Sequence, residues 1–263
     1  MDGFVPTTLL YSLSGLVVGM LVGMTGVGGG SLMTPLLIVL FGIRPEIAVG
    51  TDLLYASVTK SAGTAVHGIA QSIDWRVVRR LALGSLPGCA LAIYGLSLVG
   101  EWGSGMRAII TSVLGVALFL TVVSLLFRKT IERLALTRLP ERSDDTTRRL
   151  TVITGFVLGV LVAISSVGAG AIGVIALILL YPRLPIVKIV GSDIAHAVPL
   201  TLVAGLGHFM LGGVNWILFW ALLMGSIPGI VVGSYIATRV PEDALRFTLA
   251  AVLTVVALRL FVA

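Results

Sequence analysis

The most informative shortage in this 263-residue chain is charge. Lys, Arg, Asp and Glu together make up only 11% of the residues, whereas 57% are hydrophobic. A soluble domain of ordinary composition carries about 25% charged residues, so this chain has too few polar groups to cover a globule in water. The mean hydropathy of +1.09 and the recurring apolar stretches predict an all-α protein with many transmembrane helices.

Cysteine is almost absent as well: Cys89 is the only one, so no disulfide can form within the chain. The sequence has no cysteine cluster or His-x-x-x-His pair to hold a metal, and no Ser/His/Asp set to support nucleophilic catalysis. The glycine-rich run at 26–31 is not followed by the Lys-Ser/Thr pair of a nucleotide-binding loop. These absences argue against an enzyme, against a resident metal or cofactor, and against a pump driven by ATP.

Basic residues are also missing before the first apolar run, in the opening MDGFVPTTLLYS. A secretory signal peptide begins with a basic region, so we expect this first run to stay in the mature protein. The net charge of +6 does not call for a nucleic-acid partner, because membrane proteins hold Lys and Arg on their cytoplasmic side.

The clearest positive signal is an internal repeat. VGTDLLYA reads like a later VGSDIAHA, and GSLPG like a later GSIPG. One separation of 141 residues relates the matched positions, which are 49–56 and 190–197, His67 and His208, Trp75 and Trp216, and 84–88 and 225–229. The chain therefore divides into a first membrane repeat at 1–127, a polar cytoplasmic linker at 128–149 and a second membrane repeat at 150–263.

Each repeat is expected to contain about five apolar helical segments. These are 9–25, 30–42, 47–69, 77–98 and 106–127 in the first, and 150–166, 170–181, 188–211, 214–236 and 243–262 in the second. The second segment of each repeat is too short to cross a bilayer of about 30 Å at about 1.5 Å per residue. We expect a broken or re-entrant helix at both places.

The positions of Lys and Arg predict the orientation. If the loop at 70–80 is cytoplasmic, alternation of the segments places 14 of the 18 Lys and Arg residues on that side and three on the other, as the positive-inside rule requires. Because each repeat has an odd number of segments, the two repeats are inverted, as in many secondary transporters. We expect a multi-pass protein of the cell (inner) membrane with both termini outside.

Glycine serves two purposes in this sequence. Gly15 and Gly19, like Gly155 and Gly159, are four residues apart, a spacing that lets helices approach closely in lipid. The run GVGGGS at 26–31 is different, because consecutive glycines favour a break in the helix.

Paired glycine-rich breaks at matching positions of two repeats point to the substrate site of a transporter. The N–H groups and the dipole at the start of the helix after a break attract an anion, and glycine lets a ligand reach the backbone. A tight packing contact or a simple kink is the alternative. The candidate substrate-binding residues are Gly28, Gly29, Gly30 and Ser31 in the first repeat, and Gly168, Ala169, Gly170 and Ala171 in the second.

These motifs resemble one known family. GVGGGSLMTPLL, then GTDLLYASVTKSAGTAVH, then GSLPG is similar to the TauE/SafE family of sulfite and organosulfonate exporters, also called DUF81. The resemblance extends through both repeats, although Ala169 and Ala171 depart from the usual glycine pattern of the second. It implies the export of small sulfur-containing anions.

Charged residues inside the apolar segments are further candidates, because charge in a membrane is costly. Asp52 and Asp193 occupy matching positions and are candidates for coupling or gating. The alternative is that Thr51 or Ser192 caps the start of a helix, with the carboxylate favoured by the dipole. Lys60 is a candidate substrate ligand that could pair with a sulfonate or with Asp52; snorkelling to the interface is its alternative.

The histidines are candidates for coupling or gating too, since histidine titrates near neutral pH. His67 and His208 lie about 22 Å along their helices from the aspartates, which makes a metal site shared with them a poor prospect. A hydrogen bond to the next loop is the alternative for both. His196 follows Asp193 by one helical turn and could contact it.

The sequence thus predicts a secondary transporter that exports a small sulfur-containing anion, sulfite or a C2 organosulfonate, by alternating access. The alternatives are an anion channel of the same architecture and a transporter of a small carboxylate. The expected partners are the anionic substrate, the lipid bilayer and a coupled proton, while no oligomeric state follows from the sequence.

Overall fold

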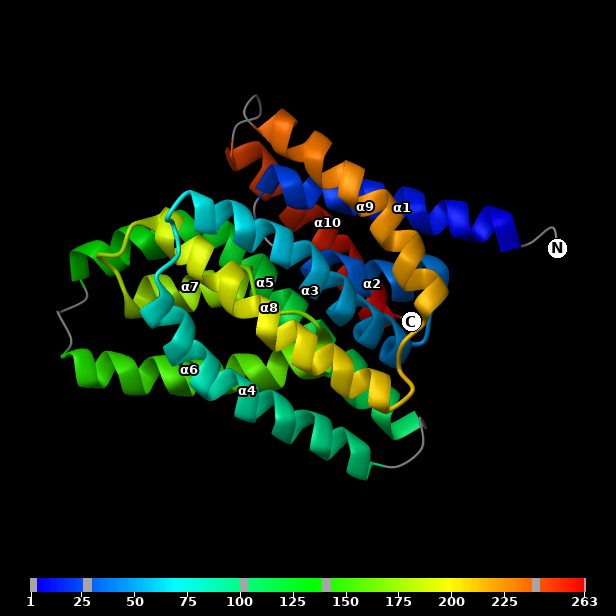
Figure 1. The fold of residues 1–263 in the computed structure, drawn as a ribbon, viewed down its shortest axis with the longest axis horizontal. Coiled ribbons are helices and arrows are strands. Elements are labelled where there is room, and N and C mark those ends of the chain that lie inside the picture. The colour runs from blue at the N-terminus through cyan, green and yellow to red at the C-terminus, as the bar shows by residue number, and fades with distance from the viewer. Residues whose placement is uncertain (1–3, 26–29, 100–103, 139–142, 238–241, 263) are drawn as a thin grey trace.

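The computed structural model describes residues 4–25, 30–99, 104–138, 143–237 and 242–262, and these are almost entirely helical, without a strand (Figure 1). The helices are α1 (Phe4–Thr25), α2 (Gly30–Phe41), α3 (Pro45–Ile69), α4 (Trp75–Leu98), α5 (Ser104–Arg138), α6 (Asp144–Ser165), α7 (Ala171–Leu180), α8 (Ile186–Met210), α9 (Trp216–Ala237) and α10 (Glu242–Val262). The predicted all-α class is confirmed, and each predicted segment corresponds to one of these helices. The stretch expected as a linker is largely helical, because α5 continues to Arg138 and α6 begins at Asp144.

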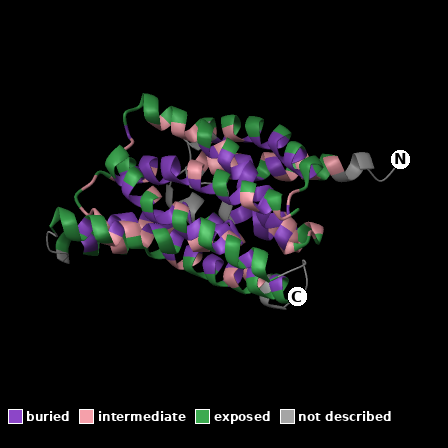
Figure 2. Cartoon of the chain, turned by 60° about the horizontal axis from the view of Figure 1, so that its bottom comes forward, coloured by how far each residue is buried: buried purple, intermediate pink, exposed green. Residues whose placement is uncertain are grey.

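Within the described ranges, five helices are long and apolar enough to cross a membrane: α4, α5, α6, α8 and α9. Large apolar side chains such as Leu98, Phe119 and Val231 are exposed on the outside of the bundle, whereas buried residues concentrate in its interior (Figure 2). An apolar exterior of this extent is suited to lipid rather than water. The chain is a multi-pass membrane protein.

Helices α3 and α8 form the centre of the bundle and run in opposite directions. A Cβ atom at Gly205 of α8 would meet Leu54 of α3, and one at Gly63 of α3 would meet Ile194 of α8. The two helices are therefore in contact over several turns. This central pair is where a membrane protein holds polar side chains at the lowest cost, because neighbouring helices shield them from lipid.

The pairs α1 with α9 and α4 with α6 each join helices from different repeats. A methyl group at Gly15 would collide with the backbone carbonyl of Leu222, and one at Gly155 would collide with the carbonyl of Leu81. Each of these contacts is the counterpart of the other in the repeat. Only glycine permits so close an approach of two helices, so the packing role predicted for these glycines is confirmed.

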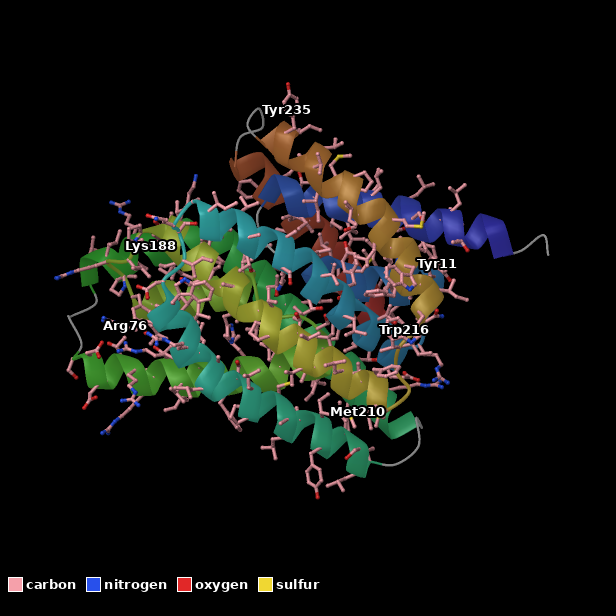
Figure 3. All side chains as sticks on the ribbon, viewed as in Figure 1. Tyr11, Arg76, Lys188, Met210, Trp216 and Tyr235 are labelled. Atoms are coloured by element: carbon pink, nitrogen blue, oxygen red, sulfur yellow. The ribbon has the colours of Figure 1, made fainter. Side chains whose placement is uncertain are left out.

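Residues expected on opposite sides of the membrane lie at opposite ends of the molecule. Arg76 and Lys188 are at one end, and Met210 and Trp216 are at the other (Figure 3). The orientation in which the first end faces the cytoplasm stays a prediction.

Candidate functional site

The break between α6 and α7 is the first feature of the candidate site. Ser166 adopts a left-handed conformation with φ of 59°, and Gly168 and Gly170 have φ values of 131° and 129°. A φ near these last values strains any residue with a side chain, which explains the two glycines. The backbone turns back over the end of α6, because a Cβ atom at Gly168 would meet Leu161 and Val162.

The matching glycines of the first repeat lie mostly outside the described residues. Gly28 and Gly29 fall in the gap between α1 and α2, and the side chain of Ser31 is also outside the described part. Gly30 begins α2, as Ala171 begins α7 in the second repeat. The structure therefore describes the backbone of the break in the second repeat alone.

Asp52 of α3 connects the two repeats. Its side chain is fully buried, and its Oδ2 atom accepts hydrogen bonds from Thr34 N (3.2 Å), Thr34 Oγ1 (2.5 Å) and Ser166 Oγ (2.9 Å). Thr34 belongs to the short helix α2, and Ser166 to the break of the second repeat. The other oxygen, Oδ1, has no hydrogen-bond partner among the described residues.

Asp193 of α8 occupies the matching position but has fewer partners. Its carboxylate accepts a hydrogen bond from the backbone N–H of Gly170, the residue just before α7. Its Oδ1 atom lies against the Cα of Gly173 and lacks a hydrogen-bond partner within the described ranges. Each aspartate thus lies at the beginning of the short helix of its own repeat, where the helix dipole favours negative charge.

The alternative role predicted for Thr51 and Ser192 is wrong in one respect. They lie in the second turn of α3 and α8 and do not cap those helices. Thr51 Oγ1 accepts a hydrogen bond from Asn215 N at 3.0 Å, and Ser192 Oγ accepts one from Asp74 N at 2.8 Å. Asn215 and Asp74 immediately precede α9 and α4, so the two hydroxyls serve the starts of other helices.

Lys60 of α3 lies at the break of the second repeat. Its side chain is buried, and Nζ donates a hydrogen bond to the carbonyl oxygen of Ala169 at 3.2 Å. The ammonium also interacts electrostatically with Asp193 and, more weakly, with Asp52. Lys60 therefore does not snorkel to an interface. Its counterpart Thr201 donates to Ala197 O of its own helix, so only one repeat carries a cation here.

The three histidines go to different places. His196 lies close to Lys60, and its Nε2 atom is 2.7 Å from Ser85 Oγ. His208 Nε2 is 2.8 Å from the carbonyl oxygen of Ala163, while His67 bonds to the loop that follows α3. His196 is thus the histidine that interacts with Lys60. Across the described residues, no group of three or more His, Cys, Asp or Glu could hold a metal ion.

Sequence reasoning missed two residues of this site, Thr34 and Ser166. Both are ordinary hydroxyl residues in apolar surroundings, and nothing in their local pattern indicates a partner. Their position is the one signal in the sequence: Thr34 follows the glycine run of the first repeat, and Ser166 stands just before Gly168 in the second.

Three ion pairs near the ends of the bundle were also missed. Glu46 is fully buried, and its Oε1 atom is 2.9 Å from Arg44 Nε and 3.6 Å from Arg107 Nε. Arg80 Nη2 lies 2.6 Å and 2.8 Å from the two carboxylate oxygens of Asp144. None of these pairs has a counterpart in the other repeat, so repeat matching could not reveal them.

Comparison with known proteins agrees with this architecture. Residues 11–260 match the family of the sulfite exporter TauE/SafE. The chain is 42% identical to the probable membrane transporter protein YjnA of Bacillus subtilis (strain 168) over 249 residues, which cover 94% of this chain and 97% of that protein. It is 29% identical to a probable membrane transporter protein of Xylella fastidiosa (strain Temecula1 / ATCC 700964), covering 86% of this chain and 83% of that one.

A third relative is the probable membrane transporter protein YdhB of Bacillus subtilis (strain 168), which is 27% identical over 90% of this chain and 94% of its own length. No solved structure gives a significant match. The family match covers both repeats and the break between α6 and α7, so the resemblance seen in the motifs is confirmed. The chain belongs to the sulfite exporter TauE/SafE family of membrane transporter proteins.

Proposed function

We propose that this protein exports a small sulfur-containing anion, sulfite or a C2 organosulfonate, across the cell (inner) membrane by alternating access. The observation that carries the proposal is the buried ammonium of Lys60 at the break before α7. A buried cation without a counterion is costly, and here two carboxylates and a backbone carbonyl compensate it until a substrate anion arrives.

The surroundings of Lys60 suit a compact oxyanion. The ammonium supplies up to three N–H donors, and the start of α7 contributes the positive end of a helix dipole. The glycines at 168 and 170 leave these two positions of the break without side chains. An anion that displaces the carbonyl of Ala169 from the ammonium would contact both the cation and the beginning of α7.

The contacts between the repeats support alternating access. The hydrogen bond from Asn215 to Thr51 and the one from Asp74 to Ser192 are the same contact in the two repeats. Inverted repeats can exchange the conformations of their halves, which opens a central site first to one side and then to the other. The hydrogen bonds of Asp52 to α2 and to the break of the second repeat support a role for its carboxylate in such a movement.

A binding panel on the purified full-length protein tests the proposal. Isothermal titration with sulfite and 2-hydroxyethanesulfonate, and with 3-hydroxypropanoate as the matched carboxylate, should show saturable binding of a sulfur oxyanion and weaker binding of the carboxylate. Binding of the carboxylate alone would assign a different substrate class.

Transport in liposomes separates a transporter from a channel. Vesicles that carry the protein in their membrane in the inside-out orientation should accumulate the bound anion. Uptake should show saturable kinetics and no large currents. Voltage-dependent currents of high conductance would favour an anion channel of the same architecture.

A further inference from the structure

We propose that binding of the anion is accompanied by the uptake of a proton, and that Asp193 is the group that receives it. This inference rests on the proposed anion site at Lys60. It names the second species that the same site would carry.

Asp52, Asp193 and Lys60 form a buried cluster with a net negative charge. Asp52, Asp193 and Lys60 are 0%, 1% and 5% exposed, and two carboxylates with one ammonium give a net charge of −1. A monoanion placed beside Lys60 would raise this to −2 in surroundings that water hardly reaches. Excess buried charge is expensive, and a titratable group usually neutralises instead.

Other titratable groups near the cluster could also compensate the added charge. Among the described residues, the titratable side chains that interact electrostatically with the three are Tyr55 of α3 and His196 of α8. Helices α2, α6 and α7 contribute hydroxyls and backbone at this place. From α4, Arg80 is held by Asp144 toward the end of the bundle, and Cys89 lies in an apolar cluster.

The two aspartates differ in their hydrogen bonds. Asp52 Oδ2 accepts from one backbone N–H and two hydroxyls, and donors directed at a carboxylate favour its ionised form. Asp193 accepts from one backbone N–H, while its Oδ1 atom has no hydrogen-bond partner within the described part of the chain. Protonation of Asp193 therefore disturbs fewer hydrogen bonds than protonation of Asp52.

His196 is a second basic group beside the cluster, in addition to Lys60. It lies beside the ammonium of Lys60, whose positive charge opposes a second positive charge there. Protonation of Asp193 has a different effect, because it gives the carboxyl group an O–H donor. The side chain would change from a group that repels the anion to one that can donate a hydrogen bond to it.

A consequence follows from the reciprocity of linked binding. If the anion favours protonation of Asp193, a proton favours binding of the anion to the same degree. Affinity should therefore rise as pH falls. A monoanion that moves with one proton carries no net charge, so transport would respond to the anion and pH gradients rather than to the membrane potential.

The test is a proton count on the detergent-purified full-length protein. Titrations with 2-hydroxyethanesulfonate, whose sulfonate stays ionised throughout, are made at one pH in two buffers of different ionisation enthalpy. Sulfite is titrated in parallel, with its own protonation subtracted. The wild-type protein should take up about one proton per anion, and its affinity should fall by up to about tenfold per pH unit over the alkaline range.

Two variants assign the proton. Asp193→Asn, which resembles the neutral acid in size, should bind the anion with almost no proton uptake and a flat pH dependence. Glu46→Gln is the matched control. Glu46, on α3, is also a fully buried carboxylate, and it pairs with Arg44. This variant should keep the proton uptake of the wild type.

The outcomes are separable. If the wild-type protein binds the anion and takes up no proton, this inference is overturned while the proposed function stands. If proton uptake persists in Asp193→Asn, another group receives the proton and the assignment is wrong. If neither anion binds at any pH, the proposed function itself fails. The wild-type count needs no variant, so poor folding of Asp193→Asn would not remove the test.

Discussion

Replacing Lys60 by Met removes the cation of the buried cluster formed by Asp52, Asp193 and Lys60 and keeps a side chain of similar length. Lys60 is buried, donates to Ala169 O, and interacts with the carboxylates of Asp193 and Asp52. The variant therefore has two consequences, one for the stability of the protein and one for the affinity of the anion.

The magnitudes follow from the burial of these groups. Removing one partner of a directly paired buried ion pair costs about 3–5 kcal/mol, because the other charge is left uncompensated. The ion pairs within 4 Å among the described residues do not include Lys60, so this range is an upper bound for Lys60→Met. Losing the ammonium as an anion ligand costs about 2 kcal/mol or more, which weakens binding by about thirtyfold or more. Lys60→Arg should restore only part of the affinity, because a guanidinium is larger and planar.

A double variant separates the two consequences. Lys60→Met with Asp193→Asn leaves one carboxylate, so the buried net charge is −1, as in the wild type. This protein should recover most of the thermal unfolding midpoint and still bind the anion weakly. Thr201→Val, at the repeat counterpart of Lys60, is the control and should change neither property, because the Thr201 hydroxyl bonds within its own helix.

The assays are thermal unfolding in detergent and isothermal titration with the anion chosen by the binding panel. A stable Lys60→Met protein with unchanged affinity would refute the role of Lys60 as a ligand. A double variant that recovers both stability and affinity would show that Lys60 only balances the charge of its neighbours.

Two further predictions concern packing and orientation. Gly173→Ala should lower the unfolding midpoint by an amount equivalent to about 1–3 kcal/mol, because the added methyl group overlaps the carboxylate of Asp193. Gly95→Ala, where a Cβ atom meets nothing within 4 Å, should be neutral or stabilising by up to about 1 kcal/mol; equal effects at both sites would contradict this explanation. A membrane-impermeant thiol reagent applied to intact cells should label Gly105→Cys and not Ser143→Cys in a background without the native cysteine, and the reverse result would invert the orientation.

Much of the fold could be predicted because membrane helices are encoded locally. A bilayer demands long apolar segments with satisfied backbone hydrogen bonds, so composition alone predicts helices at nearly the observed places. The internal repeat also anticipates contacts that occur twice, such as those of Gly15 and Gly155, which lie 140 residues apart. The break in the second repeat is predictable for the same reason, since its φ values require glycine.

The candidate site was predictable only as separate residues. Asp52, Asp193 and Lys60 are conspicuous in sequence because charge is rare in apolar segments. Their combination is not, because Lys60 meets Ala169 across 109 residues and Asp52 meets Ser166 across 114. His67 has the same kind of signal as His196 and yet lies outside the cluster.

The sequence by itself therefore determined that this is a helical membrane protein of two related halves, each with a break. The tertiary structure alone decided which polar groups face one another. Hydropathy and glycine content act over a few neighbouring residues, whereas the partner of a buried charge depends on how helices of different repeats pack. The sequence shows that Thr201 stands at the repeat counterpart of Lys60. Local patterns carry no record of packing, so the break that receives this cation is decided only by the tertiary structure.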